Sequence, residues 1–167
     1  MSEVQVSQSS ASVLAEQSLV LHRQARSILE KGKQLAEQSA REASRCGDVV
    51  GVLSAHTAIA GYFQASLGNH REAEDALRCL AAGAEALVDT TQDSVEKMRI
   101  FQVVLDAQLH HIDLLVSRGG SAIDISILLQ KVEANPFYLV HKGENQWSSR
   151  AQKARAYLDQ RRHVVAA

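Results

Sequence analysis

The stretch over residues 48–88 constrains the fold more than any other part of this chain. It holds two runs in which apolar residues recur every three or four positions, the spacing of one face of an α-helix. The runs meet at Leu67-Gly68-Asn69-His70, and glycine most easily adopts the backbone conformation that ends a helix. The sequence therefore predicts an antiparallel hairpin of helices over about 49–67 and 70–88.

Composition extends this prediction to the whole chain. Apolar residues make up 46% of the 167, but the aromatic ones are only one Trp, three Tyr and three Phe, so alanine supplies much of the apolar content. Alanine is the best helix former and proline the worst, and the chain has one proline. We expect a single all-α domain of about six helices over residues 11–163, with flexible tails over 1–10 and 164–167.

A first helix, from about Ser12 to Cys46, carries the marks of close helix packing. Its row of large apolar residues, spaced by seven as in a helix seam, consists of Leu14, Leu21, Ile28 and Leu35. A row of small residues follows four positions behind: Ser18, Ala25, Gly32 and Ser39. Gly32 costs about 1 kcal/mol inside a helix relative to alanine, and close approach of a neighbouring helix would explain its presence. Gly47 is expected to end this helix and Asp48 to cap the next.

Two further predicted helices differ in how their apolar residues are distributed around the helix. The stripe expected to face the core in helix 49–67 consists of Val49, Leu53, His56, Ala60, Phe63 and Leu67. We therefore interpret His56 as a buried, partnered histidine in preference to a ligand. The helix over about 94–117 is apolar nearly all round. Such a helix is either the central helix of the fold or an interface with a second chain, and together with the small-residue row it predicts a homo-oligomer.

Helix ends and irregular segments complete the structural prediction. Residues expected to cap helices, because an acidic or amide side chain follows three positions later, are Asn69, Asp93, Ser121 and Ser149. After a shorter helix to about Ala134, residues 135–147 show no helical period, and a last helix is expected over about 150–163. Cys46 and Cys79 are expected to be reduced and to line the core.

Within the hairpin, Gly61-Tyr62, Leu67-Gly68-Asn69-His70, Glu72-Ala73 and Ala76-Leu77 resemble a tetratricopeptide-type helical hairpin. In that family a small residue packs the two helices together, a glycine makes the turn, and an alanine of the second helix touches the first. The matching residues are Gly61, Gly68 and Ala73, and a second match has Gly119 at the turn and Pro136 at the closing position.

The resemblance covers about 40 residues and departs from the family in two ways. The hairpins recur roughly 50 residues apart, against a family repeat of about 34. Thr57 and Asp124 stand where the family has an aromatic residue and a packing alanine. The resemblance implies a protein that binds other proteins along a concave helical surface. The stripes fit either a stacked array of hairpins or a closed helical bundle.

One polar cluster could carry chemistry. Asp106, His110 and Asp113 are spaced by four and three residues, so they share one face of their helix. A carboxylate beside a histidine can help to hold a divalent metal ion, which makes these residues candidate metal ligands. The alternative is a polar strip in which the acids raise the pKa of the histidine. No Glu-x-x-His motif occurs, which argues against a di-iron carboxylate bundle.

Two groups of residues could contact a partner. The basic set of the last helix, which could meet nucleic acid or an acidic partner, is Arg150, Lys153, Arg155, Arg161 and Arg162. Its alternative is a solvated face with Ala151, Ala154 and Leu158 turned inward. The aromatic set Phe137, Tyr138 and Trp147 falls in one short stretch. These three residues could form a partner-binding surface, or they could pin that stretch to the core.

These features favour a non-enzymatic helical interaction protein, such as an adaptor, a chaperone-like protein or a regulatory module. The alternatives are a nucleic-acid-associated regulator that uses the last helix and a metal-dependent enzyme centred on His110. No phosphate loop, dinucleotide fingerprint, zinc signature or nucleophile motif is present in the sequence, so we expect no cofactor and another protein as the partner.

Net charge and targeting signals indicate the expected cellular location and exclude some classes of partner. The net charge of -1 gives no general attraction to nucleic acid or to a membrane. No apolar run approaches the ~18 residues of a membrane span, and no secretory signal is visible, so the expected location is cytoplasmic. The ending Val164-Val165-Ala166-Ala167 is similar to the small apolar tails that bacterial ATP-dependent proteases read.

Overall fold

The computed structural model describes the backbone of residues 3–143 and 145–165 and the side chains of residues 12–143 and 146–161. Every regular element in these ranges is helical, so the all-α prediction is confirmed. The elements are α1 Glu3–Arg45, α2 Val49–Ala58, the π-helix η1 Ile59–Gln64, α3 His70–Thr90, α4 Ser94–Ser117, α5 Ala122–Ala134, α6 Pro136–Val140 and α7 Asn145–Val165. Helices α1 and α7 thus extend into the segments predicted as tails, while Ala166-Ala167 lie outside the described residues.

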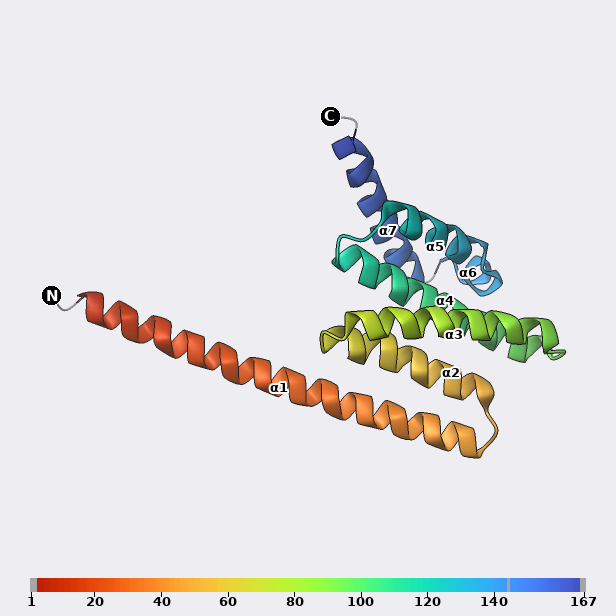
Figure 1. Ribbon diagram of the computed structural model, residues 1–167, viewed down its shortest axis with the longest axis horizontal. Helices are drawn as coiled ribbons and strands as arrows, with labels where there is room; N and C mark the ends of the chain where they lie inside the picture. The colour runs from red at the N-terminus through yellow and green to blue at the C-terminus, as the bar shows by residue number, and fades with distance from the viewer. Residues whose placement is uncertain (1–2, 144, 166–167) are drawn as a thin grey trace.

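Helix α4 is the centre of the fold. It packs against α2, η1 and α3 on one side and against α5, α6 and α7 on the other, and α1 forms an outer layer on α2 and η1 (Figure 1). Leu105, Leu109 and Ile112 of α4 are fully buried, as expected for a helix that is apolar nearly all round. Because its own chain covers it, α4 is the central helix and not the interface with a second copy that the sequence also allowed.

The predicted turns and caps are mostly present. Gly47, Gly68 and Gly119 have φ values of 72°, 89° and 68°, a region that glycine adopts without strain. Each expected N-cap at Asp48, Asp93 and Ser121 accepts a hydrogen bond from the backbone N–H three residues later. Asn69 precedes α3 as predicted, but its side chain makes no capping hydrogen bond.

The predicted core stripe of residues 49–67 is partly right. Ala60 is buried and Leu53, Phe63 and Leu67 are partly buried, but Val49 is 52% exposed and His56 is also exposed. The other buried residues of the segment are Val50, Thr57 and Ile59. The single α-helical period assumed for this segment is interrupted, because the turns of η1 close over five residues instead of four. Cys46 and Cys79 are free thiols, but both are exposed, so the expectation that they line the core is wrong.

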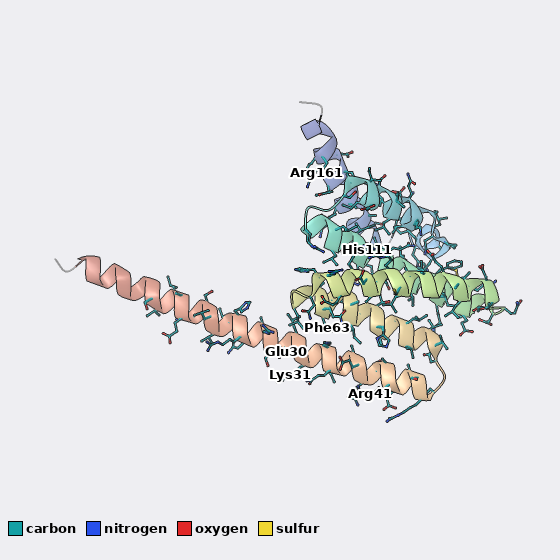
Figure 2. All side chains as sticks on the ribbon, in the orientation of Figure 1. Glu30, Lys31, Arg41, Phe63, His111 and Arg161 are labelled. Carbon is teal, nitrogen blue, oxygen red and sulfur yellow. The ribbon has the colours of Figure 1, made fainter. Side chains whose placement is uncertain are left out.

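The large-residue row of α1 faces solvent. Leu14, Leu21, Ile28 and Leu35 are 65%, 65%, 69% and 67% exposed. The helix packs instead through a neighbouring face that includes Leu29, Gly32, Ala36 and Ala40. A Cβ at Gly32 would lie 2.5 Å from Cε1 of Phe63 in η1 (Figure 2). The close approach predicted at Gly32 is therefore confirmed, whereas nothing among the described residues covers the large-residue row.

The segment over 135–147 is more regular than its sequence indicates. Oδ1 of Asn135 accepts hydrogen bonds from the N–H groups of Phe137 and Tyr138 at 2.9 and 3.3 Å. Pro136 occupies the first turn of α6, where a missing N–H costs nothing. Because α6 has only five residues, it is too short to show a period. Helix α7 begins at Asn145, so Ser149 lies inside it and does not cap it.

Candidate functional site

The polar cluster predicted around His110 fastens α7 and η1 to α4. Nε1 of Trp147 donates a hydrogen bond to Oδ1 of Asp106 at 3.0 Å, and Nε of Arg150 donates to Oδ2 of Asp113 at 2.7 Å. The ring of His110 lies 4.3 Å from that of Tyr62 in an edge-to-face arrangement, and His110 is buried. The two carboxylates of α4 are thus joined to α7, and the histidine between them packs on η1.

Burial sets the charges in this cluster. Loss of hydration lowers the pKa of His110 to about 3, and the nearby Arg150 acts in the same direction, so this imidazole is neutral at pH 7. Burial raises the pKa of Asp106, although the hydrogen bond from Trp147 and the charge of Arg150 oppose that change. The sequence-based alternative, in which the acids raise the pKa of His110, is wrong because burial outweighs any attraction from the carboxylates.

The candidate metal ligands do not come together as a metal site. In the described part of the chain, no three His, Cys, Asp or Glu side chains are close enough to hold a metal ion. Asp106, His110 and Asp113 do share one face of α4, as predicted. Their surroundings supply a Trp N–H and an Arg guanidinium, so the cluster is built to join helices.

Gly61, which the hairpin resemblance marks as a point of close helix packing, approaches α4 most closely. A Cβ at Gly61 would lie within 2.6 Å of Nδ1 and Cδ2 of His110. The tetratricopeptide resemblance implies that this residue packs the two helices of the hairpin, yet its close neighbour belongs to α4. The π-helix that brings them together had no signal in the sequence beyond the glycine itself.

The three clustered aromatic residues pin α6 and the start of α7 to the core. Tyr138 and Trp147 are only 2% and 6% exposed. The ring of Phe137 packs edge-on against Trp147 at 5.3 Å and stacks on His141 at 4.2 Å. Because Tyr138 and Trp147 are core residues, they do not form the exposed partner-binding surface that the sequence suggested.

The basic residues of α7 are largely engaged within the protein. Arg150 pairs with Asp113, and Arg155 pairs with Glu133 through hydrogen bonds of 2.9 and 2.6 Å. Arg161 donates to the carbonyl oxygen of Gly119 at 3.2 Å and lies over the ring of Tyr157. Ala151 and Ala154 are fully buried and Leu158 is partly buried, as the solvated-face alternative predicts. Lys153 is exposed, and the side chain of Arg162 lies outside the described residues.

A groove between α3 and α5, with α4 as its floor, is the best candidate for a binding site. It has a volume of about 360 Å³. Its apolar lining includes Leu77, Ala81, Ala107, Leu115, Ile127 and Leu128. Its charged lining consists of Glu74, Arg78, Glu85, Asp124 and Lys131. The sequence analysis did not identify this groove, because its residues come from three helices and share no motif.

Two buried polar atoms lie on α4 within this groove. Gln108 is 3% exposed, and its Nε2 donates to Glu85 at 3.1 Å, but its Oε1 accepts no hydrogen bond from the described residues. Nε2 of His111 is 3.6 Å from Oε1 of Glu74, too long for a hydrogen bond, and has no other partner there (Figure 2). Burial lowers the pKa of His111 despite the opposing effect of Glu74. At pH 7 the His111 imidazole is therefore neutral, and both atoms are buried beneath the groove.

Comparison with known proteins gives no match: no family model, no curated protein and no solved structure is significantly similar to this chain. None of the helices, as far as the structure describes them, is long and apolar enough to cross a membrane.

Proposed function

We propose that this protein is a non-enzymatic helical interaction module that holds a short segment of a partner protein in the groove between α3 and α5. The observation that carries this proposal is the groove itself, about 360 Å³ in volume, in which α3, α4 and α5 bring apolar and charged side chains together. Ala82 and Ile127 on its two walls are exposed, and Ile127 is 50% exposed, so a partner segment can reach apolar surface there.

The lining of the groove favours a peptide segment as its occupant. Ile127, which is 50% exposed, the exposed Ala82 and the partly buried Leu128 offer an apolar surface to an aliphatic side chain. The charged lining has three carboxylates against two cationic groups, which favours a segment with amide or basic donors over an anionic one. No Ser, Thr or Cys nucleophile lines the groove. Binding therefore explains it better than nucleophilic catalysis, in agreement with what the tetratricopeptide resemblance implies.

The proposal is tested by blocking the groove without disturbing the core. Ala82 and Ala86 are both exposed on α3, but only Ala82 lines the groove. Ala82→Arg should fill the groove, whereas Ala86→Arg adds the same side chain outside it. In affinity purification from native lysate with quantitative mass spectrometry, wild type and Ala86→Arg should recover the same partner in constant ratio. Ala82→Arg should reduce that recovery at least about tenfold, equivalent to about 1.4 kcal/mol.

Two results would overturn the proposal. Equal recovery by all three proteins would show that the partner binds elsewhere. Recovery of the bait alone, across several salt concentrations, would show that the protein is not an interaction module. Thermal melts of the variants check that each is folded, and both substituted positions are on the surface, so their melting temperatures should match the wild-type value.

A further inference from the structure

The N-terminal part of α1 has no partner within the described chain. Every side chain from residue 12 to residue 28 is exposed, and the first partly buried side chain of α1 is Leu29. We call the rest of the fold, α2 to α7, the body. Figure 1 shows this part of the helix running past the edge of α2 and η1. We call residues 3–28 the arm, and at 1.5 Å per residue it is about 39 Å long.

The sequence of the arm gives it little stability as an isolated helix. Its 26 residues include six serines and four valines, which are weaker helix formers than alanine. Among the side chains of the arm that the structure describes, Arg26 forms an exposed ion pair with Glu30 at 3.1 Å. Helices in proteins draw little of their stability from intrinsic propensity and most of it from packing of an apolar face against the rest of the structure. The arm therefore needs a surface to cover it.

The face that needs covering is a narrow stripe that is free of charge over residues 13–28. Because seven residues advance an α-helix by nearly two full turns, Leu14, Leu21, Ile28 and Leu35 lie in one band. Val13 and Val20 border this band and are 49% and 47% exposed. The charged residues Glu16, Arg23, Arg26 and Glu30 fall on the opposite side, roughly 140–220° around the helix from Leu21.

We propose that this stripe pairs with the same stripe of a second copy of the chain, as a parallel, in-register two-helix coiled coil. A seven-residue repeat of large apolar residues at one seam position is typical of supercoiled helices, and the second seam position here holds Gln17, Gln24 and Lys31. In the parallel arrangement each apolar residue of the row meets its own counterpart, and Gln17, Gln24 and Lys31 meet theirs. An antiparallel pair would place the same leucines opposite Gln17, Gln24 and Lys31.

The surface of the arm already has a place for a partner side chain. In parallel pairing Leu21 enters a hole formed by Gln17, Val20, Leu21 and Gln24 of the facing helix. The first three of these residues line a hollow on the arm together with Val13 and Glu16, so the hollow lies toward one edge of the stripe. Lys31 follows on the same side of the helix, and its long stem can carry its charge out to solvent.

The buried area and the position of the body are compatible with this pair. A large aliphatic side chain has on the order of 100 Å² of apolar surface. Six of them, each roughly half to two-thirds exposed, give about 700 Å² of apolar area over two copies, or roughly 1,200 Å² in total at ordinary interface composition. That total is the lower end of specific interfaces. The body packs on α1 through Leu29, Gly32, Ala36 and Ala40, roughly 20–100° around the helix from Leu21. Gly32 therefore lies at the edge of the stripe and the other three lie about a quarter turn from it, so the two bodies lie on opposite sides of the pair.

Sedimentation velocity of the full chain at tens of micromolar tests the pairing. Wild type should sediment as a dimer. The double variant Leu21→Glu/Ile28→Glu should be a monomer, with dissociation constant raised at least about 100-fold, because four carboxylates would enter an apolar seam. Leu19→Glu is the matched control, since Leu19 is 58% exposed but lies on the charged side, and it should remain a dimer. A monomeric wild type, or a double variant that stays dimeric, overturns the inference.

The orientation is tested separately by cross-linking. With Cys46 and Cys79 changed to serine, Leu21→Cys should form an intermolecular disulfide on mild oxidation, because the two copies of position 21 meet only in this register. A dimer that forms no such disulfide overturns the parallel register. The groove is a separate surface, so Ala82→Arg should leave the dimer intact and the double arm variant should still recover the groove partner.

Discussion

Replacing Gly61 by alanine should destabilise the fold, although the same change usually stabilises a helix. The new Cβ would lie within 2.6 Å of two ring atoms of His110. That ring is buried against Tyr62, so it cannot move aside without disturbing η1 or α4. Overpacking of this kind costs about 1–3 kcal/mol, with larger values where several atoms overlap. Because three ring atoms lie closer than 3 Å to the new Cβ, the cost belongs in the upper part of this range, about 2–3 kcal/mol. Alanine returns about 1 kcal/mol in helix propensity, so the net loss expected is about 1–2 kcal/mol.

Gly83 supplies the control for this prediction. It lies in α3, and a Cβ there would meet nothing within 4 Å. Gly83→Ala should therefore stabilise the protein by up to about 1 kcal/mol. Urea denaturation followed by circular dichroism measures both variants, and the two free energies of unfolding should differ by about 2–3 kcal/mol, several degrees in melting temperature. If Gly61→Ala is as stable as wild type, the close packing of η1 on His110 is not as described.

Two other predictions concern buried polar side chains. Because His110 has a pKa of about 3 in the folded protein and about 6.5 unfolded, the unfolded chain binds the extra proton between these values. The free energy of unfolding should therefore fall as pH drops, by up to about 3 kcal/mol at pH 4.5. His110→Phe should reduce this fall. Urea denaturation at pH 7 and at pH 4.5 measures it, and an equal loss of unfolding free energy in the variant and the wild type would contradict the prediction. Asn135→Ala should cost about 2–4 kcal/mol, because it removes two capping hydrogen bonds and one to the Phe101 carbonyl oxygen. Asn69→Ala, at a cap without a side-chain hydrogen bond, should cost less than about 0.5 kcal/mol; equal costs in chemical denaturation would refute the assignment of these bonds.

Sequence reasoning succeeded where one residue or one continuous stretch determines the structure. The caps at Asp48, Asp93 and Ser121 depend on a side chain and a backbone N–H three residues away, so they can be read locally. The apolar circumference of α4 correctly predicted its burial. Gly32 was correctly identified as a point of close approach, because a glycine that weakens a helix needs a steric reason.

Sequence reasoning failed where the structure depends on the angular phase of an apolar stripe or on contacts between distant segments. The π-turns of η1 interrupt the single α-helical period that was assumed over residues 49–67, and His56, which was predicted to lie in the core, is exposed. Trp147 and Asp106 are 41 residues apart, and no local pattern indicates that they pair. The groove residues Gln108 and His111 carried no motif, because their role depends on α3 and α5 lying on either side.

The first and fourth helices show what apolar periodicity can and cannot reveal. For both, the pattern predicted a surface that must be covered, and for α4 the chain supplies the cover on all sides. A helix that is apolar all round needs several neighbours at once, which a folded body provides more readily than a single partner helix. The stripe of α1 is narrow and regular, and one helix of matching length is enough to cover it. The width of an apolar face therefore indicates how many neighbours it requires, and it is the narrow, uncovered face of α1 that points to a second copy.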